Sequence, residues 1–207
     1  LDFVDLKKKV DLKKMAEEIK SYFKEKLGLD LNFSVQKFRI YLKFSILKEL
    51  NLAGVGESDQ LFLKVEIFSQ FDFCRNYKTE MAPIFKFNKS LLVRVFDLPT
   101  LMATKIRAVM LRKWIKTNKK GEILAAVKGR DYFDLLWYLD KGVKPNLGCL
   151  ESGNMENLKK ELINIIGQVD EKSIKFDLEP LIADTNFVNN FSKNFKESLQ
   201  RKIKELE

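Results

Sequence analysis

The residues best suited to chemistry in this 207-residue chain are charged side chains set among apolar ones. The segment 128–142 reads KGRDYFDLLWYLDKG and puts Arg130, Asp131 and Asp134 in an otherwise apolar helix. Asp131 and Asp134 are three residues apart, so they share a helix face, which Tyr138 joins one turn later. Acidic and basic groups that both point from an apolar face are what a buried phosphate site requires.

Each of these charges also has a purely structural explanation. An acid such as Asp131 in the first turn of a helix is stabilised by the helix macrodipole and by free N–H groups. Arg130 and Asp134 could form an ordinary ion pair with each other. The helix alone therefore leaves both alternatives open.

A second pair of charges lies in the segment 99–115, which Pro99 opens and which we expect to be a helix. Lys105 and Arg112 are two turns apart along one side of it, beside Met102 and Val109. A lysine among core residues is costly unless it pairs or contacts a ligand. The alternative is a side chain whose stem covers apolar surface while its ammonium group reaches water.

Glu66 is a third charge in an unusual place. In the segment LKVEIF it alternates with Phe62, Lys64 and Phe68 on one face of a predicted strand. Carboxylates are disfavoured in strands unless they are exposed or functional. A solvent-facing glutamate that pairs with neighbours is the competing interpretation.

Composition excludes several kinds of chemistry. The chain has no histidine, which removes His-based zinc sites, Ser–His catalysis and His acid–base chemistry. Cys74 and Cys149 are far apart and follow no secretory signal, so we expect reduced thiols in a cytoplasmic protein. No apolar run approaches the roughly 20 residues that span a bilayer, so we expect no membrane association.

The positive charge of the chain is concentrated in its middle. The net charge is +9, and the segment 86–144 holds fourteen Lys or Arg against five Asp or Glu, whereas the remainder holds twenty-four of each. Such a basic region suits nucleotides or nucleic acid. A solvated, lysine-rich surface explains the composition equally well.

The elements that must position these residues follow from periodicity. Helical spacing covers 11–27 and is closed by Gly28, and alternating strands follow at 31–35, 38–44 and 61–71, the last two as an antiparallel hairpin. A short strand at 91–96, a basic loop at 116–121 and helices near 131–140, 155–166 and 188–206 complete the pattern. Strands first and helices later predict an α+β fold, with a core at 1–97 and a helical region at 98–207.

These motifs, in this order, resemble a known family. FDLPTLMATKIRAVMLR followed by KGRDYFDLLWYLDKGVKPN is similar to the C-terminal motifs of the AbiEii-type nucleotidyltransferase toxins, in the DNA polymerase β-like superfamily. The family's Ala-x-Lys helix is matched at Lys105, and its Arg-Asp-x-x-Asp helix at Arg130, Asp131 and Asp134. LKVEIF resembles the strand with the superfamily's third carboxylate, which is Glu66 here.

The resemblance also bears on the first residues of the chain. The family's first motif commonly reads Ser-x-Asp-Leu-Asp-Phe after a glycine turn, and this chain begins with Leu1, Asp2 and Phe3. Asp2 therefore resembles the second aspartate. We expect the glycine turn and one metal ligand to lie upstream of Leu1.

The resemblance implies a fold and an activity. It implies a polymerase β-like sheet with helices. It implies a toxin that transfers NMP from an NTP to an RNA acceptor, tRNA. It also implies a cognate antitoxin, which need not bind the toxin stably. Asp2 and Glu66 would hold Mg²⁺ or Mn²⁺, with Glu66 also a candidate general base. Lys105, Arg112, Arg130 and Asp134 would contact the nucleotide, and Asp131 would orient Lys105 or contact the nucleotide.

Two other interpretations remain open at this point. One is a non-catalytic nucleic-acid-binding or interaction module with a degenerate nucleotidyltransferase fold. The other is a basic α+β domain without a phosphate site, in which Lys105 and Asp131 would pair only with each other.

Overall fold

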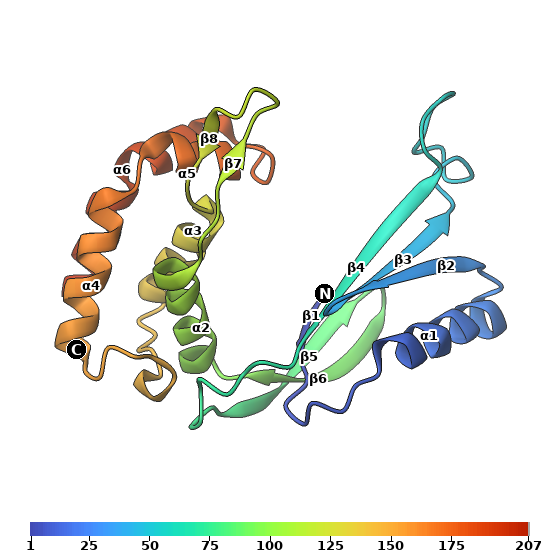
Figure 1. Cartoon of the computed structure of the whole chain (residues 1–207), viewed down its shortest axis with the longest axis horizontal. Coiled ribbons are helices and arrows are strands. Elements are labelled where there is room, and N and C mark those ends of the chain that lie inside the picture. The colour runs from blue at the N-terminus through green and yellow to red at the C-terminus, as the bar shows by residue number, and fades with distance from the viewer. Residues whose placement is uncertain (207) are drawn as a thin grey trace. The chain divides into compact units, whose positions relative to one another are not determined.

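A computed structural model describes residues 1–206, which form two compact units, one over Leu1–Phe73 and one that begins at Cys74. Figure 1 shows the course of the chain through its helices and strands. The units divide before the segment 79–96, so that segment belongs with the helices that follow it. The boundary between 97 and 98 that the sequence suggested remains a prediction about domains.

The first unit contains a four-stranded sheet. Its strands are β1 (Asp2–Val4), β2 (Leu31–Gln36), β3 (Arg39–Ser45) and β4 (Gln60–Phe68), in the order β1-β4-β3-β2. β1 runs parallel to β4, and the other neighbours are antiparallel. The strands predicted over 31–35 and 38–44 and the antiparallel hairpin are confirmed, but the strand predicted over 61–71 ends earlier, at Phe68.

One helix, α1 (Leu12–Leu27), packs against β2 and β3 of this sheet (Figure 1). Asp11 caps its start by accepting hydrogen bonds from two backbone N–H groups, and Gly28 ends it with a left-handed φ of 66°. Ala16 of the helix is fully buried. It belongs to a core cluster with buried residues that alternate along the strands, among them Ile40 and Val65. Because side chains alternate along a strand, Glu66 lies on the opposite face, which no helix of this unit covers.

The second unit begins with a hairpin, β5 (Thr79–Lys86) and β6 (Lys89–Phe96). Its base is fixed to the helical part, because Asn146 Nδ2 donates to the carbonyl oxygen of Asn76 at 2.8 Å. A disulfide joins Cys74 to Cys149. The expectation of two reduced thiols was therefore wrong, because the fold brings together two residues that lie 75 positions apart in the sequence.

Helices form the rest of the second unit. They are α2 (Leu98–Leu111), α3 (Gly129–Asp140), the 3-10 turn η1 (Leu147–Cys149), α4 (Met155–Gln168), α5 (Glu171–Leu178) and α6 (Thr185–Lys204), with the short strands β7 (Lys116–Thr117) and β8 (Ile123–Ala125) between α2 and α3. The helix expected over 99–115 ends earlier, at Leu111. The loop expected over 116–121 opens a small hairpin, β7–β8.

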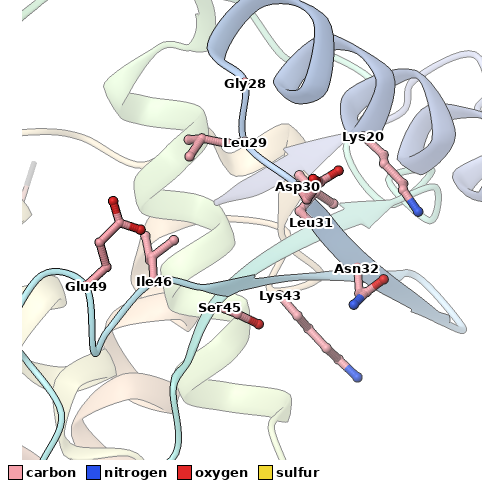
Figure 2. Close-up of a pocket in the computed structure, with 10 residues that line it drawn as sticks. All are labelled: Lys20, Gly28, Leu29, Asp30, Leu31, Asn32, Lys43, Ser45, Ile46 and Glu49. Atoms are coloured by element: carbon pink, nitrogen blue, oxygen red, sulfur yellow. The ribbon is translucent and has the colours of Figure 1, made fainter.

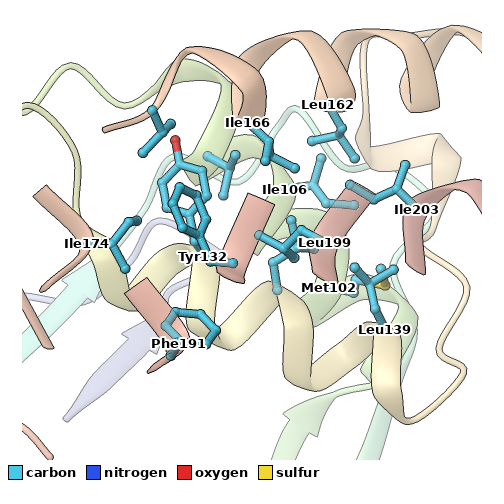
Figure 3. Packing of buried hydrophobic residues seen from close by; sticks show 14 of the residues in the cluster. Met102, Ile106, Tyr132, Leu139, Leu162, Ile166, Ile174, Phe191, Leu199 and Ile203 are labelled. Carbon is cyan, nitrogen blue, oxygen red and sulfur yellow. The ribbon is translucent and has the colours of Figure 1, made fainter. Parts of the chain in front are cut away.

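The core of the second unit is larger than that of the first. Figure 3 shows Met102 of α2 beside Leu139 of α3, while Ile106 of α2 lies among apolar side chains of α4 and α6. Helical periodicity places these residues on the inner faces of their helices. The fold is α+β with a mainly helical C-terminal part, as the sequence predicted. Within residues 1–206, no helix combines the length and apolar character needed to cross a membrane.

Candidate active site

Asp2 and Glu66, the two predicted metal ligands, are neighbours in the first unit. β1 and β4 place them directly opposite each other in a parallel pair. The backbone N–H of Glu66 donates a hydrogen bond to the carbonyl oxygen of Leu1 at 2.8 Å, which fixes this register. Residues opposite each other in a sheet point to the same face. The sheet therefore sets two carboxylates side by side on its uncovered face.

Two cations hold the Glu66 carboxylate. Arg39 on β3 donates from Nε to Oε1 at 2.5 Å, and Lys64 on the same strand as Glu66 lies 2.9 Å from Oε2. Burial raises the pKa of Glu66, but the hydrogen bonds from Lys64 and Arg39 outweigh it and hold that pKa at about 2. Glu66 is thus a fixed negative charge near neutral pH.

The pair suits a hard divalent cation that takes its remaining ligands elsewhere. Mg²⁺ is commonly bound by one or two carboxylates together with substrate phosphates and water. Across residues 1–206, no three His, Cys, Asp or Glu side chains gather closely enough to form a complete metal cage. Asp2 and Glu66 are therefore a fitting donor pair for a metal that arrives with phosphate, not for a permanently caged ion.

The second set of charges lies between α2 and α3 of the second unit. Lys105 Nζ is 3.0 Å from Asp131 Oδ1 and 2.7 Å from Asp134 Oδ2, while Arg112 donates to Asp131 Oδ2 at 2.6 Å. Lys105 lies on α2, and Arg112 caps the C-terminal end of that helix seven residues later, so one carboxylate on α3 reaches both. Lys105 and Asp131 therefore do not pair only with each other, because each has a second partner. Asp134 forms its ion pair with Lys105 and not with Arg130.

The two carboxylates of this cluster differ in how deeply they are buried. The side chain of Asp131 is only 5% exposed, whereas that of Asp134 is 44% exposed. Burial lowers the pKa of Lys105, but the hydrogen bond to Asp134 and the charge of Asp131 outweigh it and raise that pKa above its ordinary value. Lys105 therefore stays charged, and its partners hold it in one position.

Two further cations lie at the start of α3. Lys128 is the N-cap residue and makes no side-chain cap, and Arg130 in the first turn has an exposed side chain. Burial and the nearby charges of Arg112 and Arg130 lower the pKa of Lys128. Four cations thus gather at a helix N-terminus, a place that favours anions.

Gly129 explains why α3 can start where it does. A Cβ atom at this position would lie 2.5 Å from the carbonyl oxygen of Ile174, so only glycine allows α5 to pack this closely. Asp177 of the same helix accepts a hydrogen bond from the backbone N–H of Arg130 at 3.1 Å. The packing of α5 therefore sets the position of the Arg-Asp motif.

The structure adds two residues that the sequence did not single out, Arg39 and Lys128. Lys128 could have been found because it begins the motif itself. Arg39 is 27 residues from Glu66, and only strand pairing brings the two together.

A hollow in the first unit contains none of the predicted site residues. Figure 2 shows it between the end of α1 and the strands β2 and β3, lined mainly by polar and charged side chains such as Lys20, Lys43 and Glu49. One carboxylate on its wall, Asp30, is paired with Lys24. The predicted chemistry therefore does not depend on this hollow.

Comparison with known proteins agrees with the geometry. A family model described as nucleotidyl transferase AbiEii toxin, type IV toxin–antitoxin system, matches residues 1–201. No curated protein matches the chain.

Proposed function

Because the chain belongs to the AbiEii family of nucleotidyltransferase toxins from type IV toxin–antitoxin systems, we propose that it transfers NMP from an NTP to an RNA acceptor, tRNA. The observation that carries this proposal is the cluster at the start of α3. There Asp131 fixes Lys105 and Arg112 beside a helix N-terminus that also bears Lys128 and Arg130.

The cluster has the charge that a triphosphate needs. Four cations face three carboxylates, Asp131, Asp134 and Asp177, so one positive charge remains when all of them are counted. Arginine and lysine bind phosphate oxygens through charge-assisted hydrogen bonds. We assign Lys105 and Arg112 to the triphosphate, Asp131 to holding both of them, and Arg130 and Asp134 to further contacts with the nucleotide.

The proposed reaction is a displacement at the α-phosphorus. The acceptor hydroxyl oxygen forms a bond to this phosphorus, the bond to the β-phosphate oxygen breaks, pyrophosphate leaves, and the hydroxyl proton passes to water. Positive charge held near the leaving oxygens stabilises the charge that builds up there. Lys105 fits this task because its partners hold it charged and in place.

The carboxylates of the first unit fit the binding of Mg²⁺ or Mn²⁺. A metal held by Asp2 and Glu66 would supply Lewis-acid stabilisation of phosphate oxygens. A general base works best with a pKa near the working pH, and the pKa of Glu66 is about 2. The role of Glu66 is therefore better described as a permanently charged ligand than as the base.

The family implies partners and a setting as well. A cognate antitoxin is the expected protein partner, and the cytoplasm is the expected compartment because NTPs and tRNA are found there. The basic excess of residues 86–144 suits the phosphate backbone of the acceptor.

A second candidate function is a non-catalytic nucleic-acid-binding module. Glu66 favours it in one respect, because Arg39 and Lys64 already neutralise the carboxylate that a metal would need. NTP binding without transfer, or no NTP binding at all, would distinguish this module from the enzyme.

A labelled-NTP transfer assay with Mg²⁺ and total tRNA tests the proposal. We expect label on RNA from the wild type, and a loss of about 10²- to 10³-fold for Lys105→Ala, as for removal of one oxyanion-stabilising group. Lys202→Ala is the matched control, because Lys202 also forms ion pairs, with Asp140 and Glu205, but lies on α6. Absence of label on RNA with every NTP, from a folded wild type, would overturn the proposal.

A further inference from the structure

Within residues 74–206, neither strand of the hairpin β5–β6 packs extensively against another element of the second unit. Among the strands of residues 1–206, β5 and β6 pair only with each other, and most of their side chains on both faces are exposed. A two-stranded hairpin alone is marginally stable in water. The hydrogen bond between Asn146 and Asn76 anchors the base of the hairpin, which explains why the hairpin persists. This bond gives the far end of the hairpin no role in stabilising the fold.

Large aromatic side chains occupy that far end. Phe85 is 74% exposed and Phe87 is 93% exposed, and a hollow there is lined by residues 85–90 alone. Phe87 and Asn88 form the two-residue turn, both with positive φ, at 51° and 58°. Asn suits such a turn, but a bulky residue adopts a positive φ only at a cost. Among residues 1–206, the side chain of Phe87 finds almost no packing that would offset that cost, since 93% of it is exposed.

Two lysines add a second unfavourable feature that an anion would relieve. Lys86 and Lys89 lie directly opposite each other in the register of the hairpin. Like charges in this arrangement destabilise a strand pair. Neither lysine belongs to any ion pair recorded for residues 1–206. A phosphate group between them would remove the repulsion.

We propose that the hairpin tip, residues 85–90, binds the unpaired strand of an RNA, with Phe85 and Phe87 stacking on bases and Lys86 and Lys89 binding phosphates. Exposed aromatics interleaved with cations are the surface that single strands recognise. Protein interfaces are instead depleted in lysine, which disfavours a second copy of the chain as occupant. The choice of RNA rests on the proposed function, in which RNA is the acceptor.

A binding titration without NTP tests the proposal. The probes are a labelled single-stranded RNA of mixed sequence, its blunt duplex and the matching DNA strand. We expect the wild type to prefer the RNA strand, and Phe85→Ala and Phe87→Ala each to raise its Kd by about tenfold for a lost stack. In Lys86→Gln, the slope of log affinity against log salt should fall by about 0.7. Lys13→Gln on exposed α1 is the matched charge control and should leave the slope unchanged.

The outcomes are separable from the failure of the transferase proposal. If the hairpin variants lose RNA binding while the wild type transfers no NMP, the tip still binds RNA and the proposed activity is wrong. If the wild type transfers NMP and the folded hairpin variants bind RNA as tightly as it does, the tip is not the docking surface. Tighter binding of DNA than of RNA, or a dimer by light scattering that Phe87→Ala dissociates without any change in RNA affinity, would also overturn the assignment.

Discussion

In the first unit, Glu66 lies on the uncovered face of a small sheet, whereas in the second unit Asp131 lies between two helices at the edge of a larger core. Each carboxylate binds two cations. The partners of Glu66, Arg39 and Lys64, are 40% and 47% exposed, whereas those of Asp131, Lys105 and Arg112, are 22% and 39% exposed. Exposed ion pairs are screened by water, whereas a buried charge depends strongly on its partners.

The difference shows how the same residue types acquire different tasks. Strand pairing places Glu66 beside Asp2, where two carboxylates can share a cation from outside. Helix packing surrounds Asp131 with cations, which then present positive charge to an anion. The first set is therefore suited to a metal and the second to a triphosphate.

Removal of the buried carboxylate is expected to have the largest effect. Asp131→Ala leaves Lys105 and Arg112 without their shared partner, and breaking a buried pair costs about 3–5 kcal/mol of unfolding free energy. Denaturant unfolding measures this. Asp134→Ala is the matched control, because its half-exposed carboxylate should matter by less than about 1 kcal/mol. Equal losses in the two variants would erase the distinction between buried and exposed pairs.

The disulfide at the base of the hairpin comes next. Cys149→Ser opens a loop of 75 residues and should lower the unfolding free energy by about 2–4 kcal/mol. Thermal unfolding with and without a reducing agent measures the change. Alkylation of both thiols in the untreated, folded protein would show that the bond is absent, and a reductant would then have no effect.

A single methyl group at the start of α3 should have a smaller effect. Gly129→Ala forces a Cβ atom toward the backbone of Ile174, and overpacking of this kind costs about 1–3 kcal/mol. Gly167→Ala on α4 is the matched control, since its nearest neighbour would be 3.8 Å away and alanine favours a helix. A variant Gly129→Ala as stable as the wild type would contradict the close packing of α5 against the motif.

The pH dependence that comes from Glu66, whose partners are exposed, should be the smallest effect. The pKa of Glu66 is lowered from 4.5 to about 2 in the fold, so its stabilisation is present above pH 4.5 and is lost as the pH falls toward 2. We expect a loss of at most about 1 kcal/mol, because its partners are exposed. Acid unfolding of Glu66→Gln should lack this component, and an unchanged acid profile would show that the ion pairs do not hold Glu66.

Local patterns in the sequence predicted much of this fold. Asp11 and Gly28 mark the ends of α1 because a helix cap is a local signal. Alternation located β3 and β4. Helical spacing correctly indicated that Lys105 and Arg112 lie on one side, although Arg112 follows the last residue of α2. Three-residue spacing placed Asp131 and Asp134 on one face.

Features that depend on distant contacts were missed. β5 contains Pro83 and lacks the contrast between a buried and an exposed face, so its pattern indicates no strand. α5 has only eight residues, too few for a clear helical period. Arg39 and the disulfide depend on pairings 27 and 75 residues apart, which no local pattern encodes.

The most direct test of the two assignments is a comparison of Glu66→Gln with Lys105→Gln, in which NTP affinity and NMP transfer to tRNA are both measured with Mg²⁺. We predict that Glu66→Gln keeps measurable NTP binding but loses transfer, because it lacks the charged ligand for the metal. Lys105→Gln should lose both, because it lacks the contact with the triphosphate. Transfer by Glu66→Gln at the wild-type rate, or NTP binding by Lys105→Gln as tight as that of the wild type, would contradict this account.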